Sequence, residues 1–339
     1  MTTMREVAER AEVSVATVSR VINNVGYVSP DLKDRVMQAM RALQYQPSAL
    51  ARSLRRQETR TIGVLIPQID QPFFAALAYA VEKKLFDNDY RMLLCSAQED
   101  HDKEMAYAEI LVRQRVDGLI VVPTGRSSEL FDLFDQRDVP MVLVDRDIAE
   151  AKASRVLVNN FQGGYTGMAH LLELGHRHIR IIGAPAYSRA LQQRSDGAHK
   201  ALHDYGVNGD GELLVAGTLQ PYEMGYNTAL ELLHQTPRPT AIFALTDVIA
   251  VGVMHAAAKL GLRLPHDLSV VGFDDIPLAG FMIPSLTTVA QPIYEMGAHA
   301  ARLLLEHIAE PETAEHETVQ FETRLMVRDS SVRLHEDKR

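Results

Sequence analysis

From residue 61 onward, short apolar runs alternate with stretches whose apolar residues recur at helical spacing. The runs at 62–66 and 139–144 are apolar without alternation, which predicts strands buried on both faces of a sheet. Because helical stretches separate the runs, the pattern predicts parallel, doubly wound sheets. Strands are predicted at 62–66, 91–95, 116–122, 139–144, 156–158, 179–182, 213–216, 241–245 and 269–273, and helices at 73–87, 103–113, 129–136, 163–174, 194–205, 223–234 and 249–260.

These strands form two consecutive sets, which predicts two lobes of similar build. Ligands of open α/β sheets bind beyond the carboxyl ends of the strands. If the two lobes face each other, both sets of strand ends line one cleft.

The first 46 residues show a different pattern, with three short amphipathic helices. Thr3 and Glu6 have the spacing of a capping box, and Ser14 can cap a second helix soon after the first. Two helices joined by a tight turn are typical of a helix-turn-helix unit. A plain three-helix bundle would give the same pattern.

The second helix favours DNA recognition over a plain bundle. Short side chains let a helix approach base edges, and an arginine can donate two hydrogen bonds to one guanine. The exposed face is predicted to combine four short side chains with one long arginine: Val15, Ala16, Thr17, Ser19 and Arg20.

The charge distribution supports the same division of the chain. Residues 1–60 contain ten Lys or Arg and six Asp or Glu, a net charge of +4, whereas the rest of the chain has a net charge of −13. A basic head on an acidic body indicates that only the head meets a polyanion such as nucleic acid.

A short basic segment follows the third helix. Leu50 and Leu54 share one face of it, and three arginines surround that face. A helix of two turns is unstable alone in water. A basic linker explains the arginines but not the leucines, whereas a segment that folds against a minor groove, with Leu54 as an apolar wedge, explains both.

These segments carry a family resemblance. The sequence REVAERAEVSVATVSRVIN at 5–23, together with 28–30 and 45–54, resembles the lactose/galactose repressor family (LacI/GalR). The resemblance implies that the second helix reads the major groove, that neighbouring residues contact phosphates, and that Leu54 wedges into a central CpG step of a palindrome. The predicted DNA-binding residues are Thr3, Val15, Ala16, Thr17, Ser19, Arg20, Asn23, Tyr45, Ala51, Leu54 and Arg55.

One departure from the family pattern lies in the basic head. Glu12 stands at a turn where the family usually has Gly or Asn. If Glu12 adopts a left-handed backbone, the turn costs roughly 1 kcal/mol. No predicted DNA contact depends on it.

For the acidic body the resemblance implies two lobes like those of periplasmic sugar-binding proteins, joined by three chain crossings. The segment 292–307 is expected to return to the first lobe, and 322–327 to the second. The predicted domains are a helix-turn-helix DNA-binding domain at 1–46, a hinge helix and linker at 47–60, an effector-binding N-lobe at 61–160 plus 292–321, and an effector-binding C-lobe at 161–291 plus 322–339.

Polar and aromatic residues follow the predicted strands. Phe73 and Phe74 follow the first strand; adjacent aromatics are core residues in many proteins, but the family motif places at least one ring against the ligand. Asp145 and Arg146 follow another strand, where they can form a plain salt bridge or present a fork to sugar hydroxyls. The predicted effector-binding residues are Phe73, Phe74, Asp145, Arg146, Arg194, Asp247, Asp274 and Gln291.

The charges of this set suit a polyol, because carboxylates and guanidinium groups together satisfy many hydroxyls. Purine-responsive members of the family have an aromatic residue at the position of Arg146 and an arginine at the position of Ser188, which favours a sugar. The likeness is greatest to ribose-operon repressors. A purine-responsive or corepressor-type regulator is the alternative, and a sugar-binding protein without a DNA role is a third hypothesis.

The sequence contains no motif that is typical of another class of function. No phosphate-binding loop, metal-binding helix or nucleophile motif is present, so we predict neither an enzyme nor a cofactor or metal. Cys95 is the single cysteine, which excludes an intrachain disulfide. The first residues lack the apolar core of a signal peptide, so the chain is expected to be cytoplasmic.

Together these features predict a repressor that binds a near-palindromic operator as a homodimer. A ribose-like pentose or a hexose is expected to bind between the lobes, shift one lobe against the partner subunit and separate the hinges. DNA affinity would then fall. The opposite sign, in which the effector strengthens DNA binding, is equally allowed by linkage.

Overall fold

The computed structural model describes residues 2–23, 26–45, 58–124, 128–183, 188–207, 213–215 and 220–334. The chain forms two compact units, Met1–Arg60 and Thr61–Arg339. We call them the headpiece and the body, and describe each by itself. Most of the predicted hinge, residues 47–57, lies outside the described residues.

The described residues of the headpiece form three helices, α1 (Met4–Arg10), α2 (Val15–Asn23) and α3 (Pro30–Ala42). They pack around a small apolar core that includes Val7, Val18 and Val36, each fully buried. The helix-turn-helix arrangement predicted from the sequence is therefore confirmed.

The local signals that start α1 and α2 act as predicted, since the Thr17 N–H donates to Ser14 Oγ at 3.1 Å, whereas the Ser29 side chain caps no N–H of α3. Thr3 accepts from the Glu6 backbone N–H while the Glu6 side chain accepts from Thr3, which completes a capping box. Glu12 has a left-handed backbone, with φ at 51°, so the cost considered for this turn position applies. Arg35 helps to hold this turn, because its Nη2 donates to the Ala11 carbonyl at 2.7 Å and lies 3.3 Å from Glu12 Oε2.

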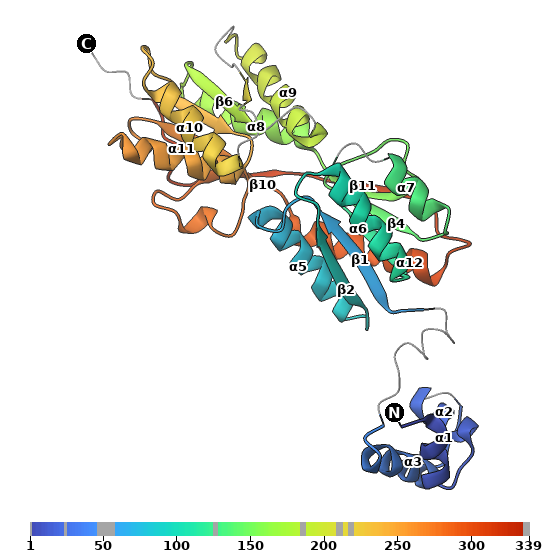
Figure 1. Cartoon of the computed structure of the whole chain (residues 1–339). Coiled ribbons are helices and arrows are strands. Elements are labelled where there is room, and N and C mark those ends of the chain that lie inside the picture. Colours follow the sequence, from blue (N-terminus) through green and yellow to red (C-terminus); the bar gives the residue numbers. More distant parts are fainter. Residues whose placement is uncertain are drawn as a thin grey trace. The chain divides into compact units, whose positions relative to one another are not determined.

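Two six-stranded sheets form the centre of the body, within the ranges that the structure describes (Figure 1). We call the halves built on them the N-lobe and the C-lobe. The N-lobe strands run in the order β11-β5-β4-β3-β1-β2, and the C-lobe strands in the order β12-β10-β9-β8-β6-β7. Their bounds are β1 (Thr61–Ile66), β2 (Arg91–Ser96), β3 (Gly118–Val121), β4 (Met141–Val144), β5 (Ser154–Val158), β6 (Ile179–Gly183), β7 (Leu213–Val215), β8 (Ala241–Ala244), β9 (Ser269–Asp274), β10 (Thr287–Ala290), β11 (Thr318–Phe321) and β12 (Arg324–Met326).

All strand pairs of both sheets are parallel except one. Strand β12 pairs antiparallel with β10 at the edge of the C-lobe sheet. The two orders are the same doubly wound order, so the lobes have the similar build that the alternating pattern predicted. The sequence did not predict β10, β11 and β12 as strands.

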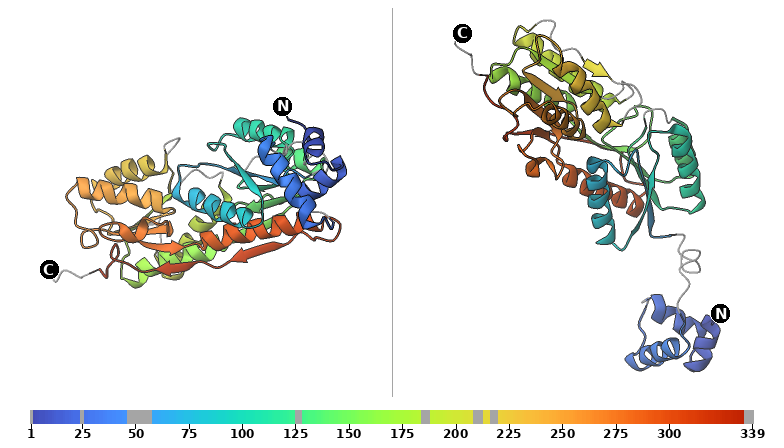
Figure 2. Two further views of the ribbon diagram at one scale, coloured as in Figure 1. Left: turned by 90° about the horizontal axis from the view of Figure 1, so that it is seen from below. Right: turned by 60° about the vertical axis from the view of Figure 1, so that its left-hand side comes forward.

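Helices cover both faces of each sheet (Figure 2). In the N-lobe α5 and α12 pack on one face and α6 and α7 on the other, and in the C-lobe α8 and α9 lie opposite α10 and α11. A short 3-10 helix, η1, follows β9. The bounds are α5 (Pro72–Phe86), α6 (His101–Arg113), α7 (Ser128–Asp135), α8 (Asn160–Glu173), α9 (Arg189–Asp204), α10 (Pro221–Leu233), α11 (Asp247–Lys259), η1 (Ala279–Phe281) and α12 (Ile293–Ala309).

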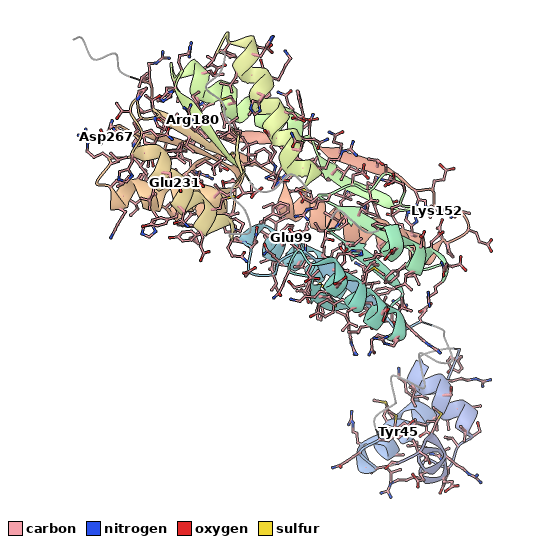
Figure 3. All side chains as sticks on the ribbon, turned by 45° about the horizontal axis from the view of Figure 1, so that its top comes forward. Tyr45, Glu99, Lys152, Arg180, Glu231 and Asp267 are labelled. Carbon is pink, nitrogen blue, oxygen red and sulfur yellow. The ribbon has the colours of Figure 1, made fainter. Side chains whose placement is uncertain are left out.

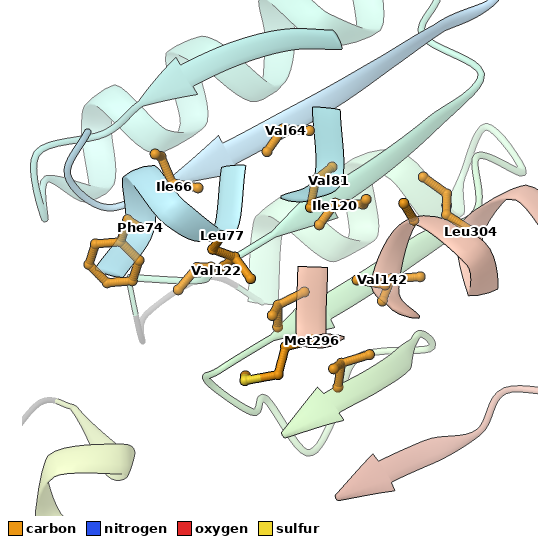
Figure 4. Packing of buried hydrophobic residues seen from close by; sticks show 14 of the residues in the cluster. Val64, Ile66, Phe74, Leu77, Val81, Ile120, Val122, Val142, Met296 and Leu304 are labelled. Atoms are coloured by element: carbon orange, nitrogen blue, oxygen red, sulfur yellow. The ribbon is translucent and has the colours of Figure 1, made fainter. Parts of the chain in front are cut away.

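Alternate residues of each strand enter opposite cores. Val64, Ile120 and Val142 point toward α5 and α12, where they meet Leu77 and Met296 (Figure 4). Because both sides of the sheet are buried, the strands are apolar throughout rather than alternating.

The chain passes between the lobes three times. It crosses from β5 to α8, returns from β10 to α12, and crosses again from β11 to β12. Each crossing follows the carboxyl end of a strand. No helix in the described part of the chain is long and apolar enough to cross a membrane.

Candidate functional site

The polar residues predicted for the site lie at the carboxyl ends of strands in both lobes. Asp145 and Arg146 directly follow β4, Asp274 ends β9, and Gln291 directly follows β10. In a doubly wound sheet this edge is where ligands bind. The fold therefore brings these side chains to one end of each lobe.

Arg194, on α9, is the centre of the C-lobe half. Its Nη1 donates to Asp274 Oδ1 at 3.1 Å and to the Leu245 carbonyl at 2.8 Å. Its Nε donates to Asn160 Oδ1 at 2.8 Å, and its guanidinium lies 3.8 Å from the ring centre of Phe273. These contacts fix one orientation of the guanidinium and compensate the burial of its charge.

Asp274 is held in a strained backbone conformation. Its φ is 120°, which favours glycine, and its Oδ1 also accepts from Gln291 Nε2 at 2.7 Å. Burial raises the pKa of Asp274 to about 6, against the lowering effects of Arg194 and Gln291. Strained residues and carboxylates of raised pKa cluster at functional sites.

The N-lobe half consists of Asp145, Arg146 and Glu99. Arg146 donates from Nη1 to Glu99 Oε2 at 2.9 Å and from Nη2 to Glu99 Oε1 at 2.6 Å, and Nη1 also donates to the Pro123 carbonyl at 3.1 Å. Asp145 is buried with φ at 64°, and its Oδ2 lies 4.0 Å from Arg146 Nε. Figure 3 shows Glu99 at the end of the N-lobe that faces the C-lobe.

Electrostatics and hydrogen bonds connect the two halves. Burial raises the pKa of Asp145, and the guanidinium of Arg194 in the other lobe lowers it more than that of Arg146. Gln68 donates to Gln220 at 3.3 Å from one lobe to the other. We call the combined group the polar cluster: Glu99, Asp145, Arg146, Arg194, Asp274 and Gln291.

Two buried acceptors of the polar cluster have no hydrogen-bond partner within the described residues. They are Asp145 Oδ1 and Gln291 Oε1. A buried polar atom without a partner costs about 1–3 kcal/mol, and most such atoms in folded proteins are paired. Both atoms can accept hydrogen bonds from a ligand that carries O–H or N–H groups.

Phe73 and Phe74 lie in the first turn of α5. The sequence left open whether they are core residues or contact the ligand. Each is 6% exposed and packs in the N-lobe core, with the two rings 5.2 Å apart in an edge-to-face arrangement. The Phe74 ring also lies 5.8 Å from the Arg146 guanidinium carbon. Phe74 therefore borders the polar cluster while it supports the core.

Asp247 differs from the other predicted site residues, and here the expectation needs correction. Its Oδ1 accepts from Thr288 Oγ1 at 2.6 Å, and its Oδ2 accepts from the Ile276 N–H at 2.9 Å. The side chain is fully buried, and burial and Asp274 raise its pKa well above its usual range. Both oxygens join α11 to β10 and to the turn after β9, which gives Asp247 a structural role.

The sequence missed two residues that hold the arginines of the polar cluster. Glu99 lies three residues beyond β2, in a turn where Gln98 and Glu99 both have positive φ, at 57° and 55°, and its side chain accepts from Arg146. Asn160 begins α8 at the first crossing and accepts from Arg194. Their position beyond a strand end was a usable signal for both.

The headpiece presents the predicted recognition face. Val15, Ala16 and Arg20 are exposed on α2, and Thr17 and Ser19 are half-buried beside them. Short exposed side chains next to one arginine suit a helix that enters a major groove.

The remaining predicted DNA contacts divide into two groups. Thr3 is exposed and caps α1, and Tyr45 packs half-buried against the headpiece core. Asn23 ends α2, but its side chain lies outside the described residues, as do Ala51, Leu54 and Arg55. In the described ranges no group of three or more His, Cys, Asp or Glu side chains is placed to hold a metal ion.

Comparison with known proteins decides the family. The model of bacterial regulatory proteins of the lacI family matches residues 3–48, and a periplasmic binding protein-like domain matches 168–331. The HTH-type transcriptional repressor PurR of Photorhabdus laumondii is 37% identical over 98% of this chain and 97% of its own length. The chain belongs to the LacI family. It is a DNA-binding transcriptional repressor with an effector-binding domain, acting in the cytoplasm, and not an enzyme.

Solved LacI-family structures agree with the fold. A regulator from Enterococcus faecium with bound ribose is 32% identical, with a TM-score of 0.75 over 81% of this chain and 100% of that one. The lac repressor dimer bound to operator and the anti-inducer ONPF is 25% identical, with a TM-score of 0.85 over 98% of this chain and 99% of that one.

Proposed function

We propose that this LacI-family repressor binds a small, hydroxyl-rich effector at the polar cluster and that the bound effector changes its affinity for operator DNA. The observation that carries the proposal is the pair of buried acceptors, Asp145 Oδ1 and Gln291 Oε1, beside two guanidinium groups. A hydroxyl donates to an acceptor and accepts from a guanidinium, so a sugar satisfies both kinds of group.

A ribose-like pentose is the first candidate. The proposed contacts are Asp145, Arg146, Arg194, Asp274 and Gln291, with Phe73 and Phe74 as the apolar wall. The ribose-bound regulator from Enterococcus faecium supports this choice, because it is similar over nearly the whole body.

A purine is the second candidate, and the whole-chain relatives support it better than a sugar. Several curated relatives at 35–38% identity over 97–98% of this chain carry the name of the purine repressor PurR. The site residues argue for the sugar, because Arg146 and Ser188 stand where purine-responsive members have an aromatic residue and an arginine. Ser188 is buried and caps α9.

Calorimetric titration of the full chain tests the two candidates directly. The panel contains D-ribose, other pentoses, hexoses, hypoxanthine and guanine. We expect a pentose to bind and the purines not to bind. Binding of a purine without any sugar would establish the alternative, and no binding by any of these compounds would refute both.

We further propose that the repressor binds a near-palindromic operator as a homodimer, with one α2 in each half-site. The operator-bound dimer of the lac repressor supports this arrangement. Leu278, Phe281 and Ile283 are 59%, 86% and 98% exposed around η1, an apolar face of the kind that subunits bury. Replacing Phe281 and Ile283 with Asp should give monomers in analytical ultracentrifugation, and an unchanged dimer would exclude this face.

The four-part domain division and the folding of hinge 47–60 on DNA belong to the same proposal. Leu54→Ala should lower operator affinity more than about tenfold while effector binding is unchanged. Arg20→Ala should relax base preference at one position in each half-site. Operator affinity and base preference equal to the wild type would refute these two roles.

A further inference from the structure

The two guanidinium groups of the polar cluster are both engaged by carboxylates of this chain. Arg194 contacts Asp274, with 4% and 6% of their side chains exposed. Arg146 holds Glu99 by two parallel hydrogen bonds, with 10% and 18% exposed. The fork of Arg146 is the group that would otherwise bind a phosphate or carboxylate of a ligand, because its geometry matches such anions.

The described members of the polar cluster carry an excess of negative charge. Three carboxylates, Glu99, Asp145 and Asp274, face two guanidinium groups, and the exposed Arg189 does not reverse this balance. The guanidinium of Arg189 lies 3.9 Å from Asp147 with 64% of its side chain exposed, so solvent screens its charge. An anionic group placed among these residues would meet buried carboxylates beside guanidinium groups that are already paired, and like charges at close range cost several kcal/mol.

The two buried acceptors of the polar cluster that have no hydrogen-bond partner carry the same polarity as this excess, while the donor Arg146 Nε lies 4.0 Å from Asp145 Oδ2. Asp145 Oδ1 and Gln291 Oε1 are both acceptors. Phosphate and carboxylate groups at neutral pH offer acceptors almost exclusively, whereas hydroxyls, amides and amines offer donors.

We propose that the polar cluster accepts a neutral, hydrogen-bond-donating effector and rejects its phosphorylated or carboxylated analogues, with Glu99 as the residue that determines this specificity. The proposal uses the effector site proposed above but holds for a sugar and for a nucleobase alike. Glu99 acts by occupying the fork of Arg146 and by adding its own negative charge.

The electrostatic reach of Glu99 supports this role. Burial is the largest effect on the pKa of Asp145 and raises it. The guanidinium groups of Arg194 and Arg146 lower this pKa, and the charge of Glu99 raises it. The carboxylate of Glu99 therefore acts on the centre of the polar cluster and not only on Arg146.

The experiment uses calorimetric titration of the full chain at pH 7.5 with matched pairs: D-ribose and D-ribose 5-phosphate, and inosine and inosine 5′-monophosphate. Inorganic phosphate is titrated as an anion alone. In the wild type we expect each phosphorylated compound to bind at least about 100-fold more weakly than its neutral partner, and inorganic phosphate not to bind.

Glu99→Gln is expected to reduce this discrimination about tenfold and to give measurable binding of inorganic phosphate, because it releases the fork of Arg146. The double variant Glu99→Gln with Arg146→Gln removes the cation as well, so the discrimination should return. Replacing a buried ion pair with neutral residues is commonly tolerated, so the double variant is expected to fold even if Glu99→Gln alone does not, and a loss of discrimination in it would contradict the proposal. Glu109→Gln, in the exposed Arg113–Glu109 pair of α6, is the matched control.

The outcomes separate this proposal from the proposed function. Equal affinity for a neutral compound and its phosphate, or a folded Glu99→Gln variant with unchanged discrimination, would overturn the role of Glu99. If no neutral compound binds the wild type, the proposed function fails, and the inorganic phosphate arm still decides: phosphate binding by Glu99→Gln alone supports the proposal, and its absence refutes it.

Discussion

The two halves of the polar cluster use similar residues in different ways. In the C-lobe, Arg194 has four partners and Asp274 is paired with both Arg194 and Gln291. In the N-lobe, Arg146 is bound to Glu99, while Asp145 keeps one buried oxygen without a partner. Both charges of the C-lobe half are therefore paired, and only the neutral Gln291 Oε1 lacks a donor there, whereas in the N-lobe half an oxygen of the Asp145 carboxylate lacks one.

This difference indicates which residues maintain the fold and which recognise the effector. A charge inside a completed network cannot be removed without leaving its partner unpaired, so stability suffers. A charge with an unused hydrogen-bonding site can be removed at little cost to the fold, so binding suffers instead.

The largest expected effect is at Arg194. Arg194→Met leaves Asp274 buried without its cation and should lower the free energy of unfolding of the body by about 3–5 kcal/mol. Denaturant unfolding followed by circular dichroism measures the loss. Arg189→Met, at an exposed arginine on the same helix, should change it by less than about 0.5 kcal/mol. Similar losses in both variants would show that the C-lobe network does not stabilise the body.

Replacing Asp145 should change effector affinity more than stability. Asp145→Asn keeps the shape of the side chain and removes a buried charge, so we expect stability within about 1 kcal/mol of the wild type. Affinity for whichever panel compound binds should fall at least about tenfold, because a charged acceptor of the ligand is lost. Calorimetry and thermal melts give the two values. A loss of stability as large as that of Arg194→Met would erase the difference between the halves.

A smaller effect follows from the pKa of Asp274. Burial raises it from 3.8 to about 6, so the folded state takes up the proton before the unfolded state does as pH falls. The stabilising contribution of this proton is full below about pH 4 and is lost as pH rises through about 6.

The wild type should therefore gain stability relative to Asp274→Asn, by about 2 kcal/mol, when the pH is lowered from 7.5 to 4.5. Subtracting the variant removes the contributions of other titrating groups, including histidines whose pKa is lowered by burial, such as His170 and His176. Denaturant unfolding at a series of pH values measures the difference, and a difference that does not depend on pH would contradict a raised pKa of Asp274.

Most of the fold could be predicted from the sequence because its strands are buried on both faces. Strand β3, for example, is apolar at every position after Gly118, since Ile120 meets one helix layer and Val121 the other. Strand β10 was missed because two of its four residues are threonines, whose hydroxyls are satisfied inside the fold. Thr287 Oγ1 accepts from the Arg328 N–H, and Thr288 Oγ1 donates to Asp247.

The site was less predictable, because a position beyond a strand end does not reveal the partners of a side chain. Asp145, Arg146, Arg194, Asp274 and Gln291 come together as expected. Asp247 has the same relation to its strand, but Thr288 and Ile276, far along the chain, occupy both of its oxygens. Glu99 is 47 residues from Arg146, and it lies in a turn with two consecutive residues of positive φ.

The three crossings have a consequence for how the protein is made. Neither lobe is a continuous stretch of chain, since the N-lobe sheet lacks β11 and the C-lobe sheet lacks β12 until residues 318–326 have been synthesised. The headpiece, by contrast, is complete after about 60 residues and forms a compact unit of its own. Translation that stops before β11 would therefore release a finished headpiece attached to two unfinished lobes, a product that could still meet DNA but would have no means of sensing a metabolite.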